Sequence, residues 1–232
     1  MKKAIFVVEG QTEQIFVERF IKALVALQPC YVTLEKLHGD SICLIGTRGS
    51  PIEFASHFIR IINAQGDDRV NSFIEDRLDG FVEKGFRVIY GLRDRYTGDG
   101  NKRVDFEKIS AYFSKISAER NIIVNTVVAI DEIEAWFLAV PKFFRAYDDS
   151  LILEKINECL GYDLSLIDIE SIEHPAMEIN KVLMTVGTKY RKHADDSHKI
   201  ANELDYDTLY LERTNDIPAL SRFTAALETI LA

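Results

Sequence analysis

Acidic residues follow three apolar segments of the sequence, each at the point where the segment ends. The segments cover residues 4–8, 86–92 and 121–130, and the acids that follow are Glu9, then Asp94, then Asp131, Glu132 and Glu134. Buried strands of a parallel sheet are apolar runs, and ligands of open α/β sheets bind beyond the carboxyl ends of the strands. Carboxylate oxygens are the ligands that Mg²⁺ and Mn²⁺ prefer. The spacing therefore predicts a divalent-cation site at one edge of a sheet.

The first segment leads into a predicted turn and helix. Gly10 provides a flexible backbone, and Phe16 and Phe20 recur at helical spacing. Glu9 is then expected at a carboxyl strand end, and Glu13 in the first helical turn, where a negative charge is favourable. Both acids could equally be solvated charges of an ordinary strand, turn and helix. Whether they belong to a cation site therefore depends on the acids at the other strand ends.

The other two segments are also predicted strands followed by acids, and each leaves an alternative open. If the strand at 86–92 neighbours the first strand, Asp94 can converge on Glu9; otherwise it is a loop acid paired with an adjacent arginine. After residue 130 a helix is expected. Its spacing puts Asp131 and Glu134 on one face and turns Glu132 elsewhere.

Residues 8–13 read Val-Glu-Gly-Gln-Thr-Glu, and they resemble the first signature of the Toprim domain, V-E-G-x-T-E. Topoisomerases, bacterial primases, recombination mediators and old-type nucleases share that domain. Its second signature is D-x-D after a strand, whereas this sequence has Asp94, Arg95 and Tyr96 and lacks the second acid. Asp99 could replace that acid only if the loop folds back.

Residues 8–13, 91–96 and 132–139 together resemble a bacterial Toprim-like family of unknown function that is related to old-type nuclease Toprim domains, and the similarity extends through residues 189–227. On this resemblance Glu9, Asp94 and Glu132 are the metal-site acids, with Glu13 beside them as a further catalytic acid. Helix-face reasoning alone keeps Glu134 as a competitor of Glu132.

The resemblance implies Mg²⁺- or Mn²⁺-dependent phosphoryl transfer, with a nuclease acting on DNA or RNA phosphodiesters as the leading hypothesis and a bacterial defence system as a setting. The candidate contacts for substrate phosphate are Arg48, Arg93, Arg95 and Arg191. The alternative is a non-catalytic Toprim-like module that binds a nucleotide, nucleic acid or a partner protein. The missing D-x-D acid and the net charge of −9 favour that alternative.

The composition indicates a globular protein. Of the 232 residues 47% are hydrophobic and 28% charged, which is typical of a globular protein, and no apolar stretch is long enough for a membrane helix. We therefore expect a cytoplasmic protein with no membrane partner. Three widely spaced cysteines predict core thiols and no disulfide framework.

We predict an α/β fold in which a mainly parallel sheet is flanked by helices. A Toprim-like domain should cover residues 1–140, and a helical C-terminal region should cover 141–232. Further strands are expected at 31–37 and 41–45, and a loop at 46–51 should lead into a helix at 51–62 that begins at Pro51. Helices are also expected at 68–83, 105–119, 151–160, 176–186, 193–204 and 217–231.

Overall fold

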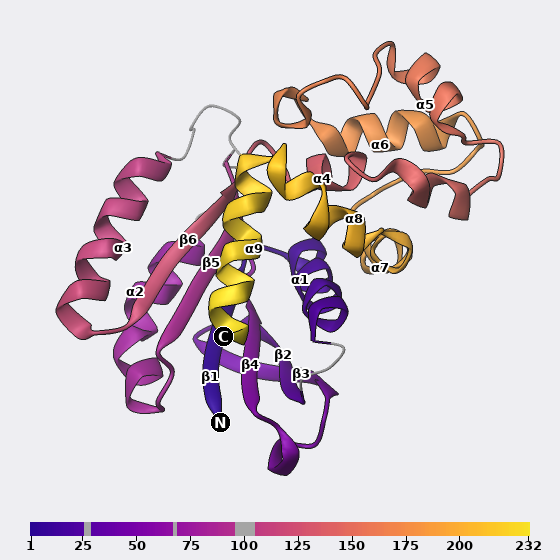
Figure 1. Ribbon diagram of the computed structural model, residues 1–232. Helices are drawn as coiled ribbons and strands as arrows, with labels where there is room; N and C mark the ends of the chain where they lie inside the picture. The colour runs from indigo at the N-terminus through magenta and orange to yellow at the C-terminus, as the bar shows by residue number, and fades with distance from the viewer. Residues whose placement is uncertain (26–28, 67–68, 96–104) are drawn as a thin grey trace. The chain divides into compact units, whose positions relative to one another are not determined.

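A computed structural model describes residues 1–25, 29–66, 69–95 and 105–232 (Figure 1). The chain divides into two compact units, a first unit formed by Met1–Val128 with Arg222–Ala232 and a second unit formed by Ala129–Ser221. The predicted boundary after residue 140 therefore lies within the second unit. The last eleven residues return to the first unit, because their apolar side chains pack on its sheet.

The first unit is built on one six-stranded sheet with the strand order β3-β2-β4-β1-β5-β6. The strands are β1 (Lys2–Val8), β2 (Cys30–His38), β3 (Ser41–Gly49), β4 (His57–Asn63), β5 (Val88–Asp94) and β6 (Ile123–Ala129). β1 pairs in parallel with β4 and β5, β2 pairs in parallel with β4, and β2 and β3 form an antiparallel hairpin. The prediction that the segments near residues 4, 86 and 122 share one mainly parallel sheet is confirmed.

Helices cover both faces of this sheet, as Figure 1 shows. On one face, Ile5 and Val7 of β1 share a core cluster with Phe73 of α2 (Arg69–Glu83) and Phe113 of α3 (Phe106–Arg120). On the other face, Phe6 contacts the ring of Phe223. That face carries α1 (Gln11–Leu24) and the part of α9 (Pro218–Leu231) from residue 222 onward. Strand alternation sends successive side chains to opposite faces, so one short strand anchors both helical layers.

The predicted helix at 51–62 is wrong. A single 3-10 turn, Ile52–Phe54, is followed by strand β4, which lies between β2 and β1. Phe54 is 72% exposed and belongs to no apolar helix face. The helical spacing of Phe54, Phe58 and Ile62 is therefore fortuitous, whereas the three isoleucines within residues 59–62 fit a buried central strand.

The predicted loop at 46–51 is also corrected, because β3 extends to Gly49. The cysteine prediction holds for Cys30, which is buried, but Cys43 is exposed on β3 and Cys159 is half-buried. Sequence spacing alone could not distinguish the edge strand from a core strand, because β3 exposes most of its side chains on both faces.

Gly91 lies where β5 passes beneath α2. A β-carbon at this position would come within 2.7 Å of Thr126 Oγ1 and 2.8 Å of Val70 Cγ1. We expect Gly91→Ala to lower the free energy of unfolding by about 1–3 kcal/mol, because the neighbours must shift. Gly80→Ala is the matched control: it has open space within 4 Å and lies inside α2, so it should gain about 0.5–1 kcal/mol. Denaturant unfolding of both variants measures this, and equal stabilities would contradict the close approach.

The second unit is helical, as predicted for the C-terminal region. Its helices are α4 (Glu134–Leu138), α5 (Leu153–Leu160), α6 (Pro175–Met184), α7 (Ala194–Glu203) and α8 (Tyr206–Leu211), with 3-10 turns at Pro141–Ala146, Ile169–Ser171 and Arg213–Asn215. Trp136 and Phe137 of α4 are buried, as are Phe143 and Phe144, whose rings stack 4.2 Å apart. None of the helices in the described part of the chain has the length and apolar character needed to cross a bilayer.

Candidate functional site

Glu9 and Asp94 lie beside each other at the carboxyl ends of β1 and β5. The two strands are parallel neighbours with Val8 opposite Leu92, so the residues that follow emerge at the same edge. The backbone N–H of Asp94 donates a hydrogen bond of 3.1 Å to Glu9 Oε2. Both residues are only 8% exposed. The Glu9 carboxylate therefore lies against the backbone of Asp94 at a largely buried edge of the sheet, where two neighbouring strands end.

The turn after β4 holds the backbone of Glu9 on the side of β1 opposite to β5. Asn63 is buried and lies opposite Val8, and its Oδ1 accepts the backbone N–H of Gln65 at 2.8 Å. Gln65 adopts a left-handed conformation with φ of 57°, and the next residue, Gly66, donates its N–H to Glu9 O at 3.1 Å. The turn after β4 therefore fixes where Glu9 leaves β1. Sequence spacing does not reveal this contribution of β4, because the segment before Asn63 also fits a helical pattern.

Glu13 lies in the first turn of α1 and is 6% exposed. Its carboxylate is folded back against the preceding turn: Oε2 would lie 2.9 Å from a β-carbon built at Gly10. Gly10 has extended backbone angles that any residue can adopt, so the need for glycine there is one of space. Glycine at this position lets the Glu13 carboxylate approach the turn that carries Glu9.

Glu132 and Glu134 belong to the second unit, where Lys192 joins them. Lys192 Nζ lies 2.8 Å from Glu132 Oε1 and 3.2 Å from Glu134 Oε2. The second Glu132 oxygen accepts the backbone N–H of Ala176 at 3.0 Å. The helix-face argument that separated Glu132 from Glu134 is corrected here, because α4 begins only at Glu134 and Glu132 lies in the preceding turn. Both oxygens of Glu132 thus have partners within the second unit.

Glu134 is fully buried, and Tyr190 donates its hydroxyl to Glu134 Oε1 at 2.8 Å. Burial raises the pKa of Glu134 above its ordinary value, and the negative charge of Glu132 raises it further, while Lys192 and the Tyr190 hydroxyl act in the opposite direction. The contacts of Glu134 with Lys192 and Tyr190 thus both lie within the second unit.

The four candidate phosphate contacts lie in different places. Arg93 is 4% exposed within β5, whereas Arg95 is half-buried directly after that strand. Arg48 pairs with Val32, which is level with Ala4, so it lies five residues from Glu9 along the strand direction, roughly 17 Å. Arg191 is in the second unit and its N–H donates to Asp196. Within the first unit, only Arg93 and Arg95 adjoin the acidic edge in sequence.

The acidic edge suits a hard cation in its chemistry. Its donors are carboxylate oxygens, and Mg²⁺ typically takes one or two of these with water and substrate phosphate. In the parts of the chain that the structure describes, no group of three or more histidine, cysteine, aspartate or glutamate side chains is arranged to hold a metal ion. Asp99, which could replace the second acid of D-x-D, lies outside the described residues, as does Tyr96.

Comparison with known proteins adds information on the fold alone. No protein-family model matches the sequence, and no curated protein matches it. A hypothetical protein from Pyrococcus horikoshii OT3 has a similar structure over the whole of both chains, with a TM-score of 0.50 and 14% sequence identity. A candidate cell-surface hydrolase from Lactobacillus plantarum WCFS1 aligns with a TM-score of 0.35 and 16% identity, over 56% of this chain and 53% of that one. This chain thus spans about half the length of the second protein.

Proposed function

We propose that this protein is a Toprim-like phosphodiesterase dependent on Mg²⁺ or Mn²⁺, and that it acts as a nuclease. The observation that supports this most is the hydrogen bond that joins the ends of β1 and β5, with the Asp94 N–H on a Glu9 oxygen. It places Glu9 and Asp94, two of the three metal-site acids that the resemblance implies, at one buried edge of the sheet.

The residues at this edge of the sheet would divide the tasks of metal binding and catalysis among them. Glu9 and Asp94 would hold the cation, which when bound would supply electrophilic polarisation of the scissile phosphodiester. The Asp94 N–H fixes one oxygen of Glu9, and the turn at Gln65 and Gly66 fixes its backbone, so little reorganisation accompanies binding. Glu13 is the candidate acceptor for the proton of the attacking water. Arg95, directly after β5, is the candidate contact for substrate phosphate.

Metal titration tests the first step of this proposal. Isothermal titration calorimetry should detect Mg²⁺ and Mn²⁺ at one weak site that Glu9→Gln loses, because an amide oxygen carries no charge to hold a hard cation. Saturation at a hundred times the dissociation constant should raise the free energy of unfolding by about 2.7 kcal/mol. Asp79→Asn, at an acid of α2 with a 77% exposed side chain, is the control and should bind as wild type does. Undiminished binding by Glu9→Gln would contradict the assignment of the site.

A non-catalytic Toprim-like module is the second candidate function. It is favoured by Tyr96, which stands where the D-x-D signature has its second acid, and by a net charge of −9, which opposes general attraction to nucleic acid. Such a module would bind a nucleotide, nucleic acid or a partner protein without cleaving it. Metal binding without cleavage of either labelled DNA or labelled RNA would favour this candidate.

A further inference from the structure

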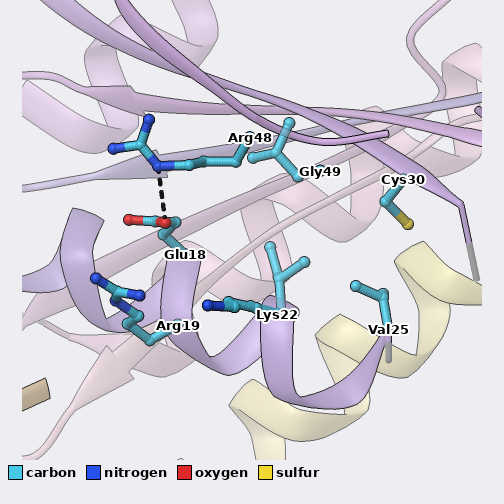
Figure 2. A pocket seen from close by; sticks show the side chains of 9 residues that line it. Glu18, Arg19, Lys22, Val25, Cys30, Arg48 and Gly49 are labelled. Carbon is cyan, nitrogen blue, oxygen red and sulfur yellow. Dashed lines mark hydrogen bonds and ion pairs between the residues drawn. The ribbon is translucent and has the colours of Figure 1, made fainter. Parts of the chain in front are cut away.

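A pocket of about 370 Å³ lies between α1, the start of β2 and the end of β3 (Figure 2). We call it the amino-edge pocket, because Cys30 begins β2 and Arg48 pairs with Val32 near that start. Glu9 and Asp94 lie at the carboxyl edge of the same sheet. The amino-edge pocket is therefore separate from the proposed metal site, and all of its lining residues belong to the first unit.

The wall of the pocket combines apolar and cationic side chains. Ile21, Val25, Cys30 and Val32 form its apolar part. Burial raises the pKa of the Cys30 thiol, so this side chain stays neutral and acts as an apolar surface. Concave sites with an apolar lining and a few placed polar groups are typical of small-molecule binding. The polar groups then decide the class of ligand.

Three cations and one carboxylate line the pocket, so positive charge is in excess. Glu18 is 5% exposed and binds Arg48, with 3.1 Å between the carboxylate Oε1 and the guanidinium Nε, as the dashed line in Figure 2 shows. This pair leaves Arg19 and Lys22 as the charges to be balanced. They are three residues apart on α1, so they are neighbours on the helix surface and repel each other.

Arg19 also has an unmet hydrogen-bonding need. Its Nε is buried, and within the described residues no acceptor lies at hydrogen-bond distance from it. A buried donor without an acceptor is costly, and a rotation of the Arg19 guanidinium toward an anionic oxygen in the pocket would satisfy it. The carbonyls at the end of α1, near Val25, oppose an anion with roughly half an elementary charge, which is smaller than the two positive charges on Arg19 and Lys22.

We propose that the amino-edge pocket binds a small organic anion with an apolar body, its carboxylate or phosphate at Arg19 and Lys22 and its apolar part against Ile21, Cys30 and Val32. At roughly 30 Å³ per non-hydrogen atom, the volume that a water molecule takes in the liquid, the 370 Å³ pocket holds about 12 such atoms. An eight-carbon monocarboxylate or alkyl monophosphate has that size. This site is independent of the proposed nuclease function.

Calorimetric titration with octanoate and octyl phosphate tests the proposal on the full chain. At least one of them should bind with a dissociation constant below the millimolar range, while octylammonium and octanol should not, because the cations select the anionic head. Arg19→Gln and Lys22→Gln should each weaken binding by about tenfold or more, the effect of losing one charged hydrogen bond. Lys115→Gln, on the exposed face of α3, should bind as wild type does.

A second readout uses the buried thiol. Bound ligand should slow the reaction of Cys30 with a thiol reagent, whereas the exposed Cys43 should react at an unchanged rate. Comparison of octanoate with octyl phosphate shows which head group the site takes. The proposal is overturned if neither anion binds at millimolar concentration, if octylammonium or octanol binds as tightly as the anions, or if the Arg19 and Lys22 variants, with wild-type melting temperatures, keep full affinity.

Discussion

Asp94→Asn and Glu9→Gln are each expected to lower metal-dependent cleavage of labelled DNA or RNA by roughly a hundredfold or more. Substitution of an outer partner that only orients a metal ligand typically costs 10–100-fold, so the loss of a charged ligand itself should cost at least as much. Glu9 and the backbone of Asp94 meet at one buried edge of the sheet. An amide at either position keeps the shape of the side chain and removes its charge.

The stability of the metal-free protein separates this role from a structural one. Removal of one of two crowded carboxylates relieves repulsion, so the melting temperature of the metal-free Asp94→Asn protein should stay level or rise. The backbone N–H that Asp94 donates to Glu9 is unchanged by the substitution. If Asp94→Asn instead lost stability and retained cleavage, Asp94 would be a structural residue and the metal assignment would be withdrawn.

Cleavage should also be measured for Glu132→Gln and Glu134→Gln, with Asp79→Asn as the exposed control. Loss of cleavage in Glu132→Gln with Glu134→Gln nearly unchanged would add Glu132 to the site, as the Toprim resemblance implies. Full activity in Glu132→Gln would leave this residue as the partner of Lys192 and of the Ala176 N–H, which is how the second unit holds it.

Phe223→Ala is expected to lower the free energy of unfolding by about 3–5 kcal/mol, and the melting temperature by on the order of 10 °C. Phe223 is fully buried, and its ring centroid lies 5.8 Å from that of Phe6, 5.5 Å from that of Phe16 and 5.4 Å from that of Phe20. Truncation leaves a cavity where α9 meets α1 and β1, and the cavity adds to the lost burial.

Phe54→Ala is the matched control for this prediction. It removes the same atoms from a ring that is 72% exposed, so the free energy of unfolding should change by less than about 0.5 kcal/mol. Denaturant titration of both variants gives the comparison. Equal effects of the two substitutions would show that residues 222–232 do not complete the core of the first unit.

Continuous apolar runs are the strongest sequence signal for the strands of this protein, because a strand that is buried on both faces is apolar along its whole length. The apolar runs at 4–8, 86–92 and 121–130 predicted β1, β5 and β6 and the edge at which Glu9 and Asp94 meet. β4 was missed because its apolar residues fit both a helical and an extended spacing. Local periodicity cannot separate the two when the run is short, since only the pairing with β1 and β2 decides.

Contacts between side chains far apart in the sequence could not be predicted from local patterns. The pairing of Lys192 with Glu132 and Glu134 joins residues that are 60 and 58 positions apart in the sequence, and no local sequence pattern predicts it. The same holds for Phe223, whose helical spacing predicts α9 but not the sheet face that it covers. The shared position of Glu9 and Asp94 at one edge could be predicted because parallel strands bring their ends to one edge as a rule of topology, whereas side-chain partners follow no such rule.

The first unit is discontinuous in sequence, and this affects how the protein is made. Ribosomes add roughly 5–20 residues per second, so the 93 residues of Ala129–Ser221 separate the two parts of the first unit by about 5–20 s. During that interval β1 and α1 have left the ribosome but Phe223 does not yet exist. Any cover for the rings of Phe6, Phe16 and Phe20 before Phe223 is synthesised must come from another part of the nascent chain or from a chaperone.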